Sequence, residues 1–216
     1  MIDTVVSAVA SFFLAGIAAA FSQNLLLTRA LGTDLLGRMQ EDGDVRIFCA
    51  LQGACALPAA VGFWLVNRFV LPHLGFLQRF GVSAYYARAF LWPLFMALVL
   101  AGVFFAVFVA CIKLAPYGEV LAAVQQLPFA AFNTFVAGML MLSASKDYTF
   151  WQTLARALGS SIGYDIVCFL LLQARRKLQN RDMPAAFRGM PASLLYLSGL
   201  ALAAWALIGH GFSDLL

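Results

Sequence analysis

The sequence predicts an all-α polytopic membrane protein, with six transmembrane helices arranged as two inverted three-helix repeats whose first and fourth helices are broken. Three observations support this prediction. Of the 216 residues, 63% are hydrophobic and only 11% are charged, whereas a soluble domain has about 25% charged residues. Six apolar stretches are long enough to cross a bilayer, and the first and fourth of them contain helix-breaking or polar residues.

The six apolar stretches define the predicted spans. A spanning helix needs about 20 apolar residues, and lipid offers the backbone no hydrogen-bond partners, so helices are expected. Only short polar connectors separate the stretches, which predicts one integral membrane domain over residues 1–216, with repeats at approximately 1–112 and 113–216. The first stretch has no preceding Lys or Arg, unlike a signal peptide, and is expected to be a retained span. The predicted spans are Thr4–Ser22, Ile47–Val66, Ala89–Ile112, Val120–Leu142, Leu154–Gln173 and Ala192–Gly209.

The distribution of basic residues predicts the orientation. Connectors one, three and five carry nine Lys and Arg residues, and connectors two and four carry five. Because cytoplasmic loops are enriched in basic residues, the odd connectors are expected inside and both termini outside. The second connector, residues 67–88, is too polar to span and is expected at the interface. The basic residues cluster beside membrane segments, so we expect the lipid bilayer as a partner and no nucleic acid.

The first predicted span continues into a stretch too long for one straight membrane helix. Residues from Thr4 to Leu36 are mostly apolar. A straight helix of that length would measure about 50 Å at 1.5 Å per residue, against a hydrocarbon core of about 30 Å. The side chains of Ser22, Gln23 and Asn24 compete with the backbone for hydrogen bonds, so the helix is expected to break there.

The fourth predicted span carries a similar interruption. Pro128 lacks a backbone N–H and clashes with the preceding turn, and Gln125, Gln126 and Asn133 flank it. Inverted repeats with breaks at matching positions can form an ion or cofactor site inside the membrane. In the alternative interpretation, Pro128 only kinks the helix and the amides join neighbouring helices.

The fifth predicted span contains a close-packing pattern and an acidic residue. Gly159 and Gly163 are four residues apart, which allows close contact with another helix. Asp165 lies near the middle of the span, where an ionised carboxylate costs at least about 2.5–3.5 kcal/mol. We therefore consider Asp165 a functional candidate, the alternative being a structural residue hydrogen-bonded to Ser or Tyr neighbours.

Four stretches in order carry a family resemblance. They are "NLLLTRALG" (24–32), "FNTFVAG" (132–138), "GSSIGY" (159–164) followed by "ARRKL", and "MPAAFRGMPASLLYLSGLALAAWALIG" (183–209). Together they resemble the Rnf/Nqr membrane-subunit family, most closely its Rnf A members with their Nqr E counterparts. The resemblance implies a subunit of an ion-translocating electron-transfer complex in a bacterial or archaeal cytoplasmic membrane. It also implies other membrane subunits as partners, including a related six-helix subunit packed as an inverted pair.

In that family, one cysteine from each broken helix of the paired subunits holds an iron–sulfur cluster. The resemblance places these positions at Asp34 and Thr134, and neither residue is the thiolate that usually binds cluster iron. The four cysteines, Cys49, Cys55, Cys111 and Cys168, lie elsewhere without metal-ligand spacing and are expected to be small buried hydrophobic residues. We therefore expect a divergent, non-catalytic subunit that binds no cofactor or metal. The candidates for an ion pathway or a helix break are Asn24, Asp34, Asn133, Thr134 and Asp165.

Three functional hypotheses follow. The first is a scaffold or ion-pathway subunit of an Rnf/Nqr-type complex. The second is a stand-alone transporter of a small solute or ion, built on the same inverted repeats with Asp34 and Asp165 in the pathway. The third retains the electron relay of the family with substitute ligands.

Overall fold

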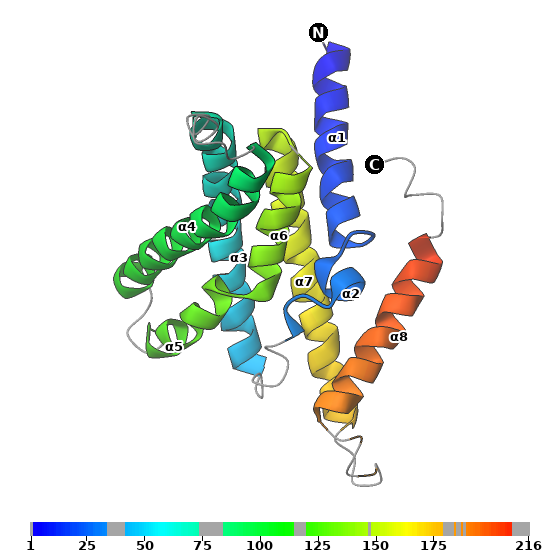
Figure 1. Cartoon of the computed structure of the whole chain (residues 1–216). Coiled ribbons are helices and arrows are strands. Elements are labelled where there is room, and N and C mark those ends of the chain that lie inside the picture. Colours follow the sequence, from blue (N-terminus) through cyan, green and yellow to red (C-terminus); the bar gives the residue numbers. More distant parts are fainter. Residues whose placement is uncertain are drawn as a thin grey trace.

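The computed structural model describes residues 2–33, 42–73, 84–114, 120–146, 148–178, 184, 187 and 189–208, and its regular elements there are all helical. Figure 1 shows an elongated bundle of long helices with two short half-helices near its centre. The helices are α1 (Ile2–Ala20), α2 (Leu25–Arg29), α3 (Asp42–Leu65), the π-helical η2 (Val66–Val70), α4 (Ala84–Leu114), α5 (Val120–Ala131), α6 (Thr134–Ser145), α7 (Phe150–Leu178) and α8 (Met190–Ile208).

Each predicted span coincides with a helix or a pair of helices. Three segments are long and apolar enough to cross a membrane alone, and the pair α5 and α6 qualifies as one span bent by 42°. Two shorter apolar helices, within α1 and α8, account for the remaining predictions. The all-α polytopic membrane class is therefore confirmed. The three long segments are Val45–His73, Ala89–Lys113 and Phe150–Arg175.

The ends of two spans differ from the prediction. Residues 67–73, expected in an interfacial connector, continue α3 as a helix through η2 to His73. Hydrogen bonding along the backbone favours extending a helix past the apolar core, and Arg side chains can reach the headgroups from there. The rest of that connector up to residue 83 lies outside the described residues.

The helix α7 begins at Phe150, four residues before the predicted start, because its N-terminus is capped. Thr149 Oγ1 accepts a hydrogen bond from the Gln152 backbone N–H at 3.4 Å, and Gln152 Oε1 accepts one from the Thr149 N–H at 3.1 Å. This reciprocal capping box satisfies two backbone donors that would otherwise lack partners.

The helices pack in matched pairs. The contact of α1 with α7 corresponds to the contact of α5 with α3. The contact of α3 with α4 likewise corresponds to that of α7 with α8. The half-helices follow the same pattern, because α2 contacts α7 and α8 where α6 contacts α3 and α4. Exchanging α1, α2, α3 and α4 for α5, α6, α7 and α8 would leave four helix pairs unchanged, and two of these pairs, α2 with α6 and α3 with α7, are in contact. In Figure 1, α3 and α7 run in opposite directions.

The contact between α1 and α7 is made backbone to backbone. A Cβ atom on Gly159 would collide with the carbonyl group of Gly16, and a Cβ atom on Gly163 would collide with the backbone of Ala20. The predicted close packing at this glycine pair is therefore confirmed.

Candidate functional site

The first helix break is organised by one amide side chain. After α1 ends at Ala20, Asn24 Oδ1 accepts hydrogen bonds from the backbone N–H groups of Leu26 (3.0 Å) and Leu27 (3.4 Å). Its Nδ2 donates to the Ala20 carbonyl oxygen at 2.9 Å. Asn24 is only 2% exposed, so a single side chain satisfies backbone groups at both broken ends away from water.

The second break is also organised by an asparagine side chain. Asn133 Oδ1 accepts from the Phe135 N–H at 3.1 Å and begins α6, and Asn133 is 1% exposed. The break lies at Phe132 and Asn133 rather than at Pro128, because α5 continues for three residues beyond the proline. The predicted interruption of the fourth span is present, but the asparagine and not the proline marks it.

The two breaks meet at Gly32. Its N–H donates to Thr134 Oγ1 at 2.8 Å, and its carbonyl oxygen accepts from the Tyr164 hydroxyl at 3.1 Å. The Tyr164 hydroxyl in turn accepts from Asn133 Nδ2 at 3.4 Å. We call Gly32, Asn133, Thr134 and Tyr164 the junction. Gly32 is buried, has a φ of +89°, and would bring a Cβ to 2.5 Å from the Tyr164 ring.

Of the predicted site residues, Asn24, Asn133 and Thr134 are therefore held at the breaks, whereas Asp34 lies outside the described residues. Tyr164 and Gly32 had received no role from the sequence, although both lie in the motifs that carry the family resemblance. A tyrosine in the middle of an apolar span was a usable signal, since a buried hydroxyl normally has a hydrogen-bond partner.

Asp165 directly follows Tyr164 of the junction in sequence, but its side chain lies near a different helix, α3. The Cys49 thiol of α3 lies near the Asp165 carboxyl and near Cys168. Asp165 is partly buried, and its Oδ1 has no hydrogen-bond partner among the described residues. A thiol on another helix therefore lies near the Asp165 carboxyl.

Two further polar side chains extend this group along the same helices. Gln52 is completely buried, and neither its Oε1 nor its Nε2 has a partner in the described part of the chain. Ser161 is 5% exposed, and its hydroxyl likewise has none there. Because α3 and α7 contact each other and run antiparallel, we infer that Gln52, one turn after Cys49, lies at the level of Ser161, one turn before Asp165. We call Cys49, Gln52, Ser161 and Asp165 the polar strip.

The comparisons with known proteins agree with this architecture. No family model matches the chain. Three similar proteins, each named as the A subunit of an ion-translocating oxidoreductase complex, come from Syntrophotalea carbinolica, Aromatoleum aromaticum and Edwardsiella ictaluri. The first is 36% identical over 77 residues (36% of this chain and 40% of the relative), and the second is 32% identical over 83 residues (38% and 43%). The third is 29% identical over 145 residues, covering 67% of this chain and 68% of the relative.

The chain is similar to the A subunits of ion-translocating oxidoreductase complexes. It spans about two fifths of the length of the first two relatives that it matches and about two thirds of the third. The match to the third relative covers 145 residues and so extends well beyond a single helix or helix break.

The described residues do not fit the thiolate-held cluster that the resemblance to the Rnf/Nqr family implies. The Thr134 hydroxyl stands where a cysteine would be expected and accepts the hydrogen bond of Gly32. No group of three His, Cys, Asp or Glu residues in the described ranges is placed to hold a metal ion. Thiolates are the usual ligands of cluster iron, so we derive no electron-transfer step through this chain.

We expect Thr134→Val to destabilise the protein by about 1–3 kcal/mol, the cost of leaving a buried donor without its acceptor. Valine has nearly the shape of threonine but leaves the buried Gly32 N–H without the oxygen that accepts it at 2.8 Å. Chemical unfolding in detergent micelles measures the change. Thr134→Ser keeps the hydroxyl and is the matched control, expected to lose less. Equal stability of the valine variant and the parent would contradict the junction.

Proposed function

We propose that the chain is a non-catalytic membrane subunit of an Rnf-type ion-translocating oxidoreductase complex. The observation that carries this proposal is its similarity to proteins named as the A subunit of such a complex, in one case over 67% of this chain. In this role the chain acts as a scaffold and contributes to an ion pathway. It acts with other membrane subunits, among them a related six-helix subunit packed as an inverted pair.

We further infer that residues 1–112 and 113–216 are inverted repeats. Each half opens with an apolar helix, an asparagine-capped break and a half-helix, followed by two long helices. The matched helix contacts support this inference, since most of them are preserved when the two halves are exchanged. An odd number of spans in each half reverses the second half relative to the first. Together with the Lys and Arg distribution, six spans support external termini in a cytoplasmic membrane.

The polar strip supports the ion-pathway role. It offers carboxylate, amide and hydroxyl oxygens between α3 and α7, and such hard oxygen ligands suit Na⁺ or a proton-carrying chain of water. Asp165 is the ionisable member and the residue to which we assign the cation. Asn24, Asn133 and Thr134 use their hydrogen-bonding atoms to hold the breaks, so we assign them a structural role. Asp34 remains a second candidate for the pathway.

Affinity purification of the tagged chain from native membranes tests the proposal. We expect it to bring down flavin-bearing and iron–sulfur-bearing subunits. An Asp165→Asn variant is expected to assemble to the same yield but to lose most ion transport coupled to electron transfer, while Asp165→Glu, which keeps the carboxyl, retains more.

Two outcomes would contradict the proposal. One is a stable chain that is always recovered alone. The other is solute or ion flux into proteoliposomes that contain this chain by itself, with that flux lost in Asp165→Asn. The second result would instead support a stand-alone transporter.

A further inference from the structure

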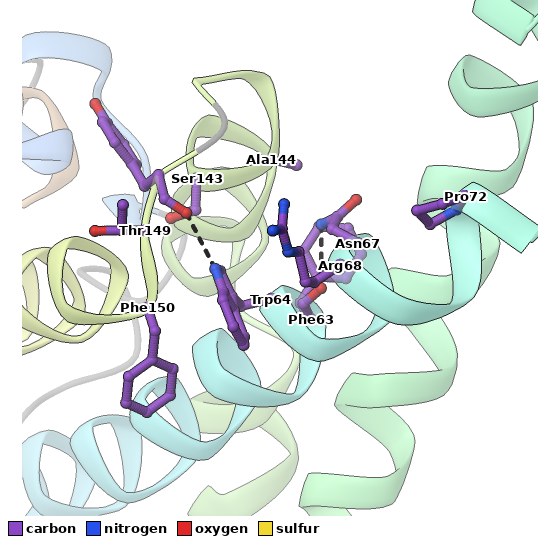
Figure 2. Close-up of a pocket in the computed structure, with 10 residues that line it drawn as sticks. Phe63, Trp64, Asn67, Arg68, Pro72, Ser143, Ala144, Thr149 and Phe150 are labelled. Carbon is purple, nitrogen blue, oxygen red and sulfur yellow. Dashed lines mark hydrogen bonds between the residues drawn. The ribbon is translucent and has the colours of Figure 1, made fainter.

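A pocket of about 590 Å³ lies at the opposite end of α3 from the polar strip. Figure 2 shows that its walls come from the end of α3 with η2, the end of α6 and the start of α7. Trp64 Nε1 donates to the Tyr148 carbonyl oxygen at 3.0 Å, which ties α3 to the turn between α6 and α7. The lining residues are Phe63, Trp64, Asn67, Arg68, Pro72, Ser143, Ala144, Tyr148, Thr149 and Phe150.

The pocket is at the level where spans leave the hydrocarbon core. The span Val45–His73 ends just beyond it, α6 ends at Ser145, and α7 begins at Phe150. Aromatic side chains form one wall, since the Trp64 and Phe150 rings lie 5.2 Å apart in an edge-to-face arrangement. Tryptophan and tyrosine are enriched at this depth in membrane proteins because their rings have both apolar and polar parts. The pocket therefore opens at the interface between lipid and water.

The polar side of the pocket is arranged to receive an anion. Among the described lining residues Arg68 is the one that is charged, and its exposed guanidinium makes no hydrogen bond or ion pair with any of the described residues. The Ser143 hydroxyl also makes no hydrogen bond within the described ranges. Asn67 uses one N–H on the Phe63 carbonyl at 3.1 Å and has a second N–H available. Figure 2 shows the Arg68 guanidinium and the Asn67 amide together at the α3 side of this space.

We propose that this pocket binds the phosphate-bearing headgroup of an anionic phospholipid. The Arg68 guanidinium matches the geometry of two phosphate oxygens, and Ser143 and Asn67 supply further donors. The Trp64 and Phe150 rings contact the glycerol and the first methylene groups of the acyl chains. The volume is within the range of pockets that hold small ligands. Basic residues near the membrane surface attract anionic headgroups, and this site does not depend on the role of the chain in a complex.

Lipid titration of the purified full-length chain, followed by native mass spectrometry, tests this site. We expect phosphatidylglycerol to bind more tightly than phosphatidylcholine. In Arg68→Gln, phosphatidylglycerol binding should weaken about five-fold, the loss expected for one basic contact to an anionic headgroup. Lys113→Gln removes an equal charge from the exposed end of α4 and should leave binding unchanged. Ser143→Leu fills the pocket without changing charge and should also weaken binding.

The outcomes separate the possible occupants. Equal weakening in Arg68→Gln and Lys113→Gln would reveal a general attraction of anionic lipid to a basic protein and would overturn the proposal. Displacement of the lipid by millimolar inorganic phosphate alone would indicate a site for the free ion and would overturn it too. Unfolding in lipid-free detergent should be the same for Arg68→Gln and the parent, which excludes misfolding as the cause of weaker binding. Unchanged lipid binding in Ser143→Leu would place the headgroup elsewhere.

Discussion

Gly32→Ala is expected to lose about 2–5 kcal/mol of stability, combining a positive φ that costs about 1–2 kcal/mol with overpacking that costs about 1–3 kcal/mol. The new Cβ would lie 2.5 Å from Tyr164 Cε2 and 2.9 Å from the Tyr164 hydroxyl oxygen. Both atoms belong to the side chain whose hydroxyl holds the Gly32 carbonyl. The methyl group therefore cannot be accommodated without breaking the junction. Chemical unfolding in detergent, followed by tryptophan fluorescence, measures the loss.

Gly189 provides the matched control for this prediction. Its φ is +78°, close to that of Gly32, but no atom lies within 4 Å of a Cβ built on it. Gly189→Ala should therefore show only the backbone cost of about 1–2 kcal/mol. The difference between the two alanine variants measures the contact with Tyr164, and a difference of zero would mean that Gly32 does not touch that ring.

Gly159→Ala is expected to cost about 3 kcal/mol, at the upper end of the range for overpacking. The obstacle is the backbone carbonyl of Gly16 rather than a movable side chain, so the whole of α1 must shift away from α7. Thermal unfolding in micelles and the protease sensitivity of α1 report this shift, and both should change together. Gly163→Ala should act in the same direction through the backbone of Ala20.

Gly53→Ala tests whether any glycine-to-alanine change in a span would have such an effect. Gly53 lies inside α3, and no atom is within 4 Å of a Cβ built there. Alanine is favoured over glycine in a helix by up to about 1 kcal/mol, so this variant should be neutral or slightly more stable. A similar loss in Gly53→Ala and Gly159→Ala would refute the close packing of α1 on α7.

The fold was predictable where local chemistry decides the structure. Long apolar runs locate the spans, because lipid leaves the backbone no alternative to helices. The break at Asn24 was also predictable, since a polar side chain in an overlong stretch offers the backbone a new partner. At the second break the strongest local signal, Pro128, was misleading. A proline removes one hydrogen bond and can be kept inside a helix, whereas Asn133 supplies the cap that starts a new one.

The tertiary contacts that build the site could not be predicted from the sequence. The bonds of Gly32 to Thr134 and Tyr164 connect residues 102 and 132 positions apart, and hydrophobic periodicity does not say which helices become neighbours. Gln52 appeared as a single amide in an apolar run, with nothing to indicate that it would be completely buried without a hydrogen-bond partner among the described residues. Asp165 was predicted as a candidate because burying an ionised carboxylate in lipid is costly. Nothing in the sequence indicated that the Cys49 thiol of α3 would lie near it.

The two hydrogen bonds of the Gly32 backbone join separate helices at one residue. One residue is bonded through its N–H to the second half and through its carbonyl to α7, so translation of α2 against α6 would stretch both bonds at once. Gly32 therefore fastens the end of the first half-helix to α6 and α7 together, so the two breaks are held as one unit.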